Sequence, residues 1–209
     1  MKLKKKAKRV IVILLVIILI LLGILFMSDK FSGNNKVKET KIVNKIDEYG
    51  YNLKDSKTKR YHKMFEELKK ILSKDEVDEE EYVKKISEMF IYDFFSLNDK
   101  TAKTDIGGVD FVYSEALANF LLKAEDTYYK YVESNIYGNR NQSLPTVKAI
   151  EITNVSQEVF AYGDKTDEKA YIVEATWTYT DEGFSKYQTS AKLRFIHDGN
   201  KLSLVELQK

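Results

Sequence analysis

Two histidines, His62 and His197, are the side chains of this chain best suited to proton transfer near neutral pH. His62 falls on the polar side of an expected helix and His197 lies beside an expected hairpin turn, so we interpret both as surface histidines. The chain has no cysteine, which excludes a thiolate nucleophile, a thiolate metal site and a disulfide. It has no Gly-x-Ser-x-Gly motif either. We therefore predict no catalytic residue, no cofactor and no metal site.

Two short motifs resemble ligand loops but lack the spacing that ligands need. Residues 75–81 form the densest acidic run, without the oxygen spacing and central glycine of a calcium loop, so we interpret them as the start of a helix. Ile106, Gly107 and Gly108 follow no strand and precede no Gly-Lys-Ser/Thr, which excludes a phosphate loop. We expect a turn with positive φ, with close approach of a ligand or partner as the alternative.

An aromatic row on two expected strands is the strongest candidate for a ligand pocket. With a nearby acid, whose pKa burial would raise, the row could bind and deprotonate a small molecule. The alternative is that the row belongs to the core against the helices. The possible pocket-lining residues are Tyr171, Trp177, Tyr179 and Tyr187, with Asp105 and Asp126 as the acids.

An apolar segment precedes all of these residues. Residues 10–27 carry no charged or polar side chain, and 18 residues of helix span about 27 Å, enough to cross the hydrocarbon layer. The sequence after it offers no small-x-small cleavage site, so we predict an uncleaved transmembrane helix rather than a signal peptide. Residues 1–9 form a basic tip, residues 28–45 a polar tether and residues 46–209 one domain.

The charges flanking this segment predict its orientation. Six basic residues and no acidic residue precede it, which places the N-terminus in the cytoplasm and the domain outside the cell membrane. The other 28 basic residues face 32 acidic residues, so the outer part carries a net charge of about −4. We therefore expect no nucleic-acid surface and name the membrane as the first partner.

Three helices are expected before the strands. Apolar residues recur at spacings of three and four in residues 59–72. Asp78 is the expected N-cap of a second helix, whose apolar face reaches Leu97. A third is expected over residues 111–137 and ends at Gly138. Its tyrosines cannot all face inward, and exposed tyrosine indicates a protein contact or self-association.

From residue 146 the apolar period becomes two, which predicts strands. We expect strands at residues 147–155, 158–162, 171–179, 187–195 and 202–207, the last two joined by a turn at Asp198 and Gly199. Helices followed by a strand meander predict an α+β domain, with three helices packed on a curved antiparallel sheet of four or five strands.

This order resembles the cone-like fold of nuclear-transport-factor-like proteins, and with one span it also resembles the inner-membrane assembly factors of type IV secretion, which are scaffolds. Three runs are similar to a family of uncharacterised membrane-anchored proteins of AT-rich Gram-positive bacteria, which implies no activity. These runs are IDEYGY at 46–51, DFFSLNDK at 93–100 with DIGG at 105–108, and KAEDTYYKYVESNIYG at 123–138. We expect an extracytoplasmic scaffold or binding module, such as one in an envelope or secretion assembly, with a small-ligand receptor or enzyme as the alternative.

The topology can be tested with protease. Added to intact spheroplasts, protease should digest the chain from Phe31 onward and spare the basic tip, because the cations hold that tip in the cytoplasm. Neutralising the six cations should weaken this orientation without abolishing insertion, which depends on apolar length. Protection of the domain, or a mature chain beginning after Met27, would contradict the prediction.

Overall fold

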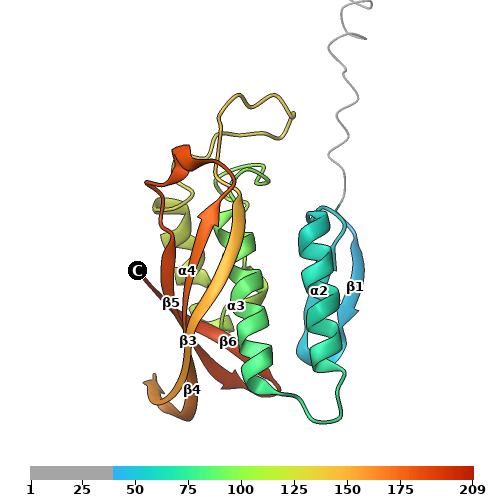
Figure 1. Ribbon diagram of the computed structural model, residues 1–209, viewed down its shortest axis with the longest axis vertical. Coiled ribbons are helices and arrows are strands. Elements are labelled where there is room, and N and C mark those ends of the chain that lie inside the picture. Colours follow the sequence, from blue (N-terminus) through green and yellow to red (C-terminus); the bar gives the residue numbers. More distant parts are fainter. Residues whose placement is uncertain (1–39) are drawn as a thin grey trace, which may run out of the picture. The chain divides into compact units, whose positions relative to one another are not determined.

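The computed structural model describes residues 40–209 (Figure 1). The predicted tip, span and most of the tether lie outside these residues. Within residues 40–209, no helix combines the length and apolarity that a membrane crossing needs.

The described chain is α+β, as predicted, with three α-helices and a four-stranded antiparallel sheet in the order β3-β4-β5-β6. A separate two-stranded sheet precedes them. The elements are β1 Ile42–Ile46, β2 Tyr51–Lys54, α2 Lys59–Leu72, α3 Glu79–Phe95, α4 Ser114–Asp126, β3 Val147–Tyr162, β4 Lys165–Tyr179, β5 Ser190–Asp198 and β6 Lys201–Gln208, with short 3-10 turns η1 Asp47–Tyr49, η2 Val109–Phe111 and η3 Glu182–Phe184.

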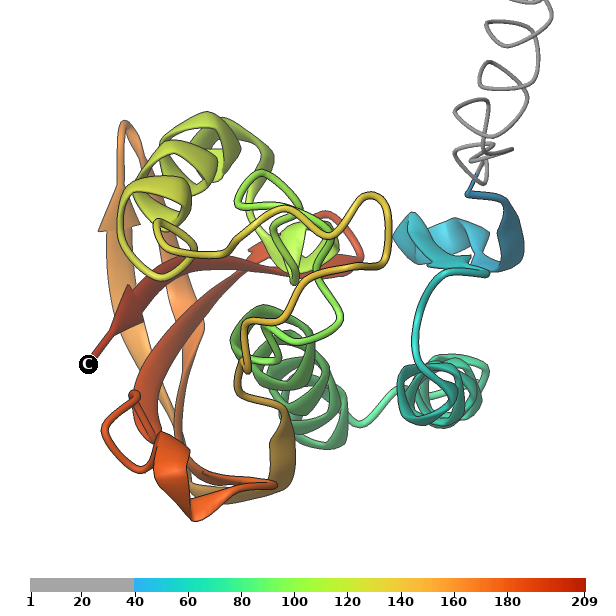
Figure 2. The ribbon, with the colours of Figure 1, turned by 90° about the horizontal axis from the view of Figure 1, so that it is seen from above.

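Helix α3 is the centre of the core, and the sheet curves around it (Figure 2). Asp78 caps the helix as predicted, because its Oδ1 accepts the backbone N–H groups of Glu80 and Glu81 at 3.0 Å. Most of its later residues are buried. Helix α2 packs against α3, so α3 is the helix that covers the sheet most directly.

Helix α4 is shorter than predicted and lies along the free edge of β6. Val112 forms a parallel bridge with Leu204, and the Tyr113 N–H donates to the Leu204 carbonyl at 2.8 Å just before α4 begins. This extended pair prevents a helix from starting at Phe111. The helix ends at Asp126 because Tyr129, fully buried, donates its hydroxyl to the Phe94 carbonyl at 2.7 Å and draws the chain away from the helix axis.

The strands also differ in detail from the prediction. Residues 147–155 and 158–162 form one strand, β3, with irregular register near Glu158 rather than a break. Strand β1 begins at Ile42, inside the segment expected to be tether, so a hairpin precedes the helices. The sequence of β1, Ile-Val-Asn-Lys-Ile, does not alternate apolar and polar residues, so the usual signal for a half-buried strand is missing.

The turn at residues 106–108 passes directly against α3. A Cβ atom on Gly107 would lie 2.1 Å from the Asp93 carbonyl oxygen. Gly108 has φ +73°, and its Cβ would lie 2.5 Å from the Phe90 ring. The turn with positive φ is therefore confirmed at Gly108, and the chain that approaches both glycines closely is the protein's own central helix, so both glycines are required by sterics.

Replacing Gly108 with alanine should destabilise the chain far more than the same change at Gly199. Gly199 has a similar φ of +64°, and a Cβ atom there would meet no other atom within 4 Å, so the change costs only the left-handed strain, about 1 to 2 kcal/mol. Gly108→Ala adds overpacking against Phe90, about 1 to 3 kcal/mol more. Denaturant unfolding of both purified variants measures the difference, and equal losses would refute the packing argument.

Candidate functional site

Two neighbouring cavities form one apolar groove, which we call the α4 groove. The larger, about 600 Å³, lies between α4, α3 and the edge of β6. The smaller, about 360 Å³, lies between the end of α3 and the connection that follows α4. Both are lined by Phe94, Thr127 and Tyr128, so the two cavities meet at these three residues. Further lining residues are Ala116, Phe120, Lys123, Leu204 and Leu207 on the larger side and Leu97, Tyr131, Gln142, Leu144, Tyr179 and Tyr187 on the smaller.

The groove exists because α4 presents small side chains to its neighbours. Ala124 is the single fully buried residue of α4, and Phe120 spans the gap to α3 with its ring 5.4 Å from that of Phe94. Leu122 points outward and is exposed. A helix with this many apolar residues and so little burial leaves apolar surface accessible beside and beneath it.

Tyr128 is held in place by hydrogen bonding and by ring packing. Its hydroxyl donates to Gln188 Oε1 at 2.5 Å, and its ring packs edge-on against Phe94 and Phe95 at 5.2 and 5.4 Å. Gln188 belongs to the connection between β4 and β5, so this bond joins the two sides of the groove.

The predicted aromatic row divides between groove and core. Tyr179 and Tyr187 line the smaller cavity. Trp177 lies behind them, buried against Phe95 at 4.3 Å, and donates its indole N–H to the Tyr179 hydroxyl at 3.0 Å. Tyr171, on β4, lies away from the groove, and its hydroxyl donates to Glu79 at the start of α3. Burial raises the pKa of Tyr179 to about 12, so this hydroxyl stays protonated.

The two predicted acids do not line the groove. Asp105 is exposed and accepts hydrogen bonds from the backbone N–H and the hydroxyl of Thr101 at 2.8 and 3.0 Å. Asp126 is exposed at the end of α4. Neither acid is among the residues that line the two cavities.

The carboxylate that does reach the groove is Glu206, on β6. Its Oε2 is buried and pairs with Arg194. Arg194 also pairs with Glu158 at 2.6 Å and lies over the Phe160 ring at 4.5 Å. The Arg194 guanidinium therefore forms an ion pair with the Glu206 carboxylate, and no other acidic side chain lines the groove within residues 40–209.

His197 lies in a separate polar cavity of about 210 Å³. Its Nδ1 lies 2.9 Å from Asp167 and its Nε2 3.4 Å from Glu79, so β5, β4 and α3 meet at this ring. Burial alone would lower the pKa of His197, but the hydrogen bonds to Asp167 and Glu79 outweigh it and raise the pKa. The surface interpretation of this histidine misses these contacts, which no short motif in the sequence indicates.

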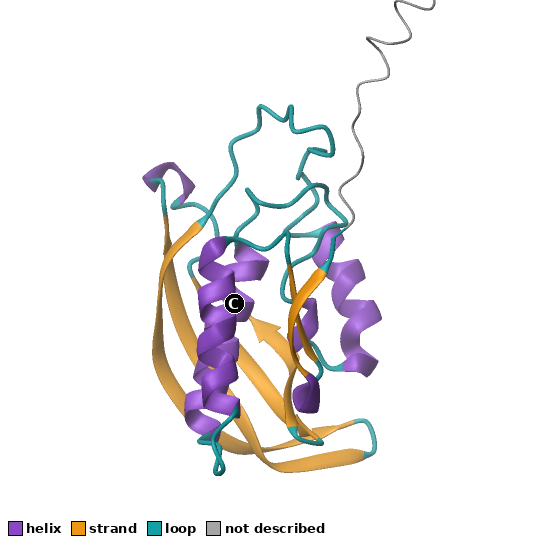
Figure 3. Cartoon of the chain, turned by 90° about the vertical axis from the view of Figure 1, so that its right-hand side faces the viewer, coloured by secondary structure: helices purple, strands orange, loops and turns teal. Residues whose placement is uncertain are grey.

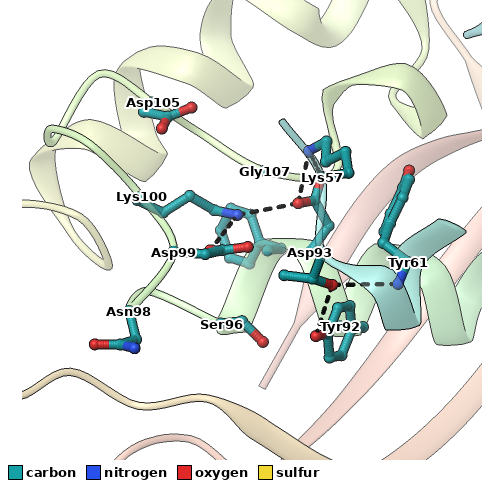
Figure 4. Close-up of polar contacts among 12 residues, drawn as sticks. Lys57, Tyr61, Tyr92, Asp93, Ser96, Asn98, Asp99, Lys100, Asp105 and Gly107 are labelled. Carbon is teal, nitrogen blue, oxygen red and sulfur yellow. Dashed lines mark hydrogen bonds and ion pairs between the residues drawn. The ribbon is translucent and has the colours of Figure 1, made fainter. Parts of the chain in front are cut away.

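A buried ionic cluster lies behind the groove (Figure 4). Asp93, near the end of α3, is bound by Lys57 Nζ at 2.6 Å and by Lys100 Nζ at 3.0 Å, and it accepts the Gly108 N–H at 2.7 Å. Burial opposes its ionisation, but Lys100, Lys57 and the Gly108 N–H outweigh burial and lower the pKa of Asp93 to about 2. A charged residue inside the apolar run of α3 was the available signal for this cluster.

Each carboxylate oxygen of Asp93 has two partners within the protein: Oδ1 accepts from Lys57 and Lys100, and Oδ2 from Lys57 and the Gly108 N–H. Lys100 also contacts Asp99 at 2.8 Å, and the Tyr129 hydroxyl accepts the Gly107 N–H at 3.0 Å. Burial raises the pKa of Tyr129, which keeps that hydroxyl a donor to Phe94. The cluster is therefore structural, and within residues 40–209 no three His, Asp or Glu side chains converge to hold a metal ion.

No family model, no curated protein and no solved structure matches this sequence.

The His197 contacts predict that stability depends on pH. The folded pKa of His197 is raised above its unfolded value of about 6.5, so its contribution is present below that pH and is lost as pH rises through the folded pKa. In the wild-type protein, the free energy of unfolding should fall by about 0.5 kcal/mol between pH 6 and pH 8, and His197→Gln should abolish this fall. The effect is small because the His197 ring is 32% exposed and screened by water.

The measurement is the denaturant midpoint at both pH values. His62→Gln, which removes the other histidine from α2, is the matched control and should leave the wild-type pH difference in place. If His197→Gln keeps that difference, the ion pairs with Asp167 and Glu79 do not contribute to stability.

Proposed function

We propose that this protein is a membrane-anchored extracytoplasmic scaffold or binding module, and that it binds a protein partner in the α4 groove. The observation that carries the proposal is the groove itself. Apolar side chains of α4 and β6 remain accessible on a domain whose core is otherwise well filled. Accessible apolar surface of this kind is typical of a contact site.

The anchor supports the location of this activity. Residues 10–27 form an apolar run long enough to cross a bilayer, and six basic residues precede it. In this proposal the N-terminus is cytoplasmic, the chain crosses the cell membrane once, and residues 40–209 act outside it.

The chemistry of the groove favours binding over catalysis. Its polar groups are hydroxyls, amides and Lys123, while Glu206 is engaged by Arg194. A general base needs a free titratable group within hydrogen-bond reach of a substrate. His197, the best candidate by residue type, lies in another cavity and is already bound to Asp167 and Glu79. We therefore propose that the protein is not an enzyme.

The arrangement of the elements supports a finer proposal about the fold. A sheet that curves around α3, with α4 at its edge, is compatible with the cone-like architecture expected from the order of elements (Figure 2). The resemblance to assembly factors of type IV secretion suggests a role in an envelope assembly. Fold analogy alone does not establish function, so the groove is the feature to test.

A small-ligand receptor is the second candidate. The volume of about 600 Å³ falls within the range of small-molecule pockets, and the lining combines apolar walls with Asn119, Lys123 and Thr127 as polar groups. Native mass spectrometry of the purified chain decides between the two. A small molecule that binds the wild-type protein but not the groove-filling variant Ala116→Phe favours the receptor.

The protein-contact proposal predicts a site-specific cross-link. A photoreactive amino acid at Asn119, on the rim of the groove, should form a discrete adduct in intact cells. The same residue at Lys63, exposed on α2, should not form it. Ala116→Phe should reduce the adduct at least tenfold by filling the groove, a loss of at least about 1.4 kcal/mol of binding.

Ala118→Phe is the matched control, because Ala118 lies exposed on the same helix and does not line the groove. It should leave the adduct unchanged. Thermal unfolding of both variants checks that they fold. Absence of any partner or self-adduct from Asn119, or equal loss in the two alanine variants, overturns the groove as a protein contact site.

A further inference from the structure

The connection between α4 and β3, residues 127–146, is ordered by polar contacts directed at its own backbone; we call it the tip loop. The Asn135 N–H donates to the Thr101 carbonyl at 2.7 Å. The Gln142 side chain bonds two backbone groups across the loop: its Nε2 donates to the Tyr131 carbonyl at 2.7 Å, and its Oε1 accepts the Glu133 N–H at 2.9 Å. The backbone of this long loop is therefore well satisfied.

Arg140 fixes the tip loop to the rest of the domain. Its guanidinium donates to the carbonyls of Lys100 and Asn98, each at 2.8 Å, and to the carbonyl of Glu133 at 3.2 Å. Lys100 is one of the two cations that pair with the buried Asp93, so Arg140 joins the loop to this cluster.

Three large apolar side chains of this loop face solvent. Tyr131, Ile136 and Tyr137 are 76, 57 and 70% exposed. Surface loops usually present polar side chains, and here Arg140 and Gln142 bond backbone groups while three large apolar side chains face solvent. Such a surface is stabilised when a less aqueous environment covers it.

The position of the loop indicates what covers it. The tip loop projects from the end of the domain at which the described chain begins, and the β3–β4 hairpin forms the opposite end (Figures 1 and 3). Only residues 28–39 separate Thr40 from the predicted span, and twelve residues reach at most about 40 Å. An anchored chain therefore holds this end of the domain close to the bilayer.

We propose that the tip loop docks on the outer surface of the membrane, with Tyr131, Ile136 and Tyr137 in the interfacial zone between headgroups and hydrocarbon. Tyrosine suits that zone because its ring is apolar and its hydroxyl stays hydrated. The inference rests on the anchor of the proposed function and adds an orientation: the tip loop faces the lipid, and the β3–β4 hairpin faces away.

The charges of the loop give no preference for one lipid headgroup over another. Lys130 lies over the Tyr131 ring at 5.4 Å, Glu133 is exposed, and Arg140 is used within the fold. The loop thus has no basic cluster for anionic lipid. Intrinsic affinity can be weak, because the tether makes docking intramolecular, at an effective concentration of about millimolar.

The experiment uses the full chain in lipid nanodiscs. The protein has no cysteine, so single-cysteine variants Tyr137→Cys and Val159→Cys accept one label each. Val159 is 62% exposed and lies toward the β3–β4 hairpin. A fluorophore at residue 137 should be quenched by headgroup-attached spin label at least threefold more than at residue 159, equally with zwitterionic and mixed anionic lipid. Equal quenching at the two positions overturns the proposal.

A second variant separates docking from folding. A label at Ser134→Cys, exposed in the loop, should lose its quenching when Tyr131, Ile136 and Tyr137 are all changed to serine, while the circular dichroism stays unchanged. Retained quenching in this triple variant, or quenching that needs anionic lipid, counts against the interfacial contact. Quenching in native membranes that lipid alone does not reproduce would instead assign the surface to a protein partner and overturn the proposal.

Failure of the anchor is recognised separately. If the chain does not float with lipid vesicles after an alkaline carbonate wash, the span at residues 10–27 is wrong and the proposed function falls with it. If the chain floats but the labels at residues 137 and 159 are quenched equally, the anchor stands and only the docking of the tip loop is refuted.

Discussion

The carboxylate of Asp93 joins α3 to three other segments of the chain. Lys57 precedes α2, Lys100 follows α3, and the Gly108 N–H belongs to the turn before α4. Because the folded pKa of Asp93 is lowered to about 2, its ionised form contributes stability above its unfolded pKa, about 2 to 3 kcal/mol, which is lost as pH falls through 2. The larger effect is on removal of one partner: an uncompensated buried charge costs about 3 to 5 kcal/mol, which makes the cluster a condition for the fold.

The same cluster positions the groove and the tip loop. Phe94, next to Asp93, lines both cavities, and its carbonyl accepts the Tyr129 hydroxyl that ends α4. Gly107 can lie against α3 because it has no side chain, and its N–H donates to that hydroxyl. Two of the quoted runs, 93–100 with 105–108 and 123–138, therefore meet in space and carry packing rather than chemistry. A resemblance based on such runs would therefore indicate shared packing in the fold.

The sequence predicts elements with strong local signals and fails where tertiary contacts decide. The periodicity of α2 and α3 and the cap at Asp78 were sufficient to place both helices. The end of α4 depends on Tyr129 reaching Phe94, and the sequence of β1 does not alternate apolar and polar residues, so neither boundary could be predicted. Of the candidate site residues, Tyr179 and Tyr187 reach the groove, whereas Asp105 turns back to Thr101. The groove itself arises from a gap between α4 and β6, and a gap leaves no pattern in either segment.

The distribution of polar and apolar groups bears on function more than any single residue does. In the described domain, the charged groups with the strongest contacts, Asp93, Lys100 and Arg194, are committed to holding elements together. The accessible surfaces at the α4 groove and the tip loop are apolar, and Tyr131 belongs to both. Catalysis needs the reverse arrangement, with free titratable groups at an accessible site. In the proposed function, one apolar surface would lie against the membrane and the other would bind a partner, and preorganised contacts lose little entropy on binding.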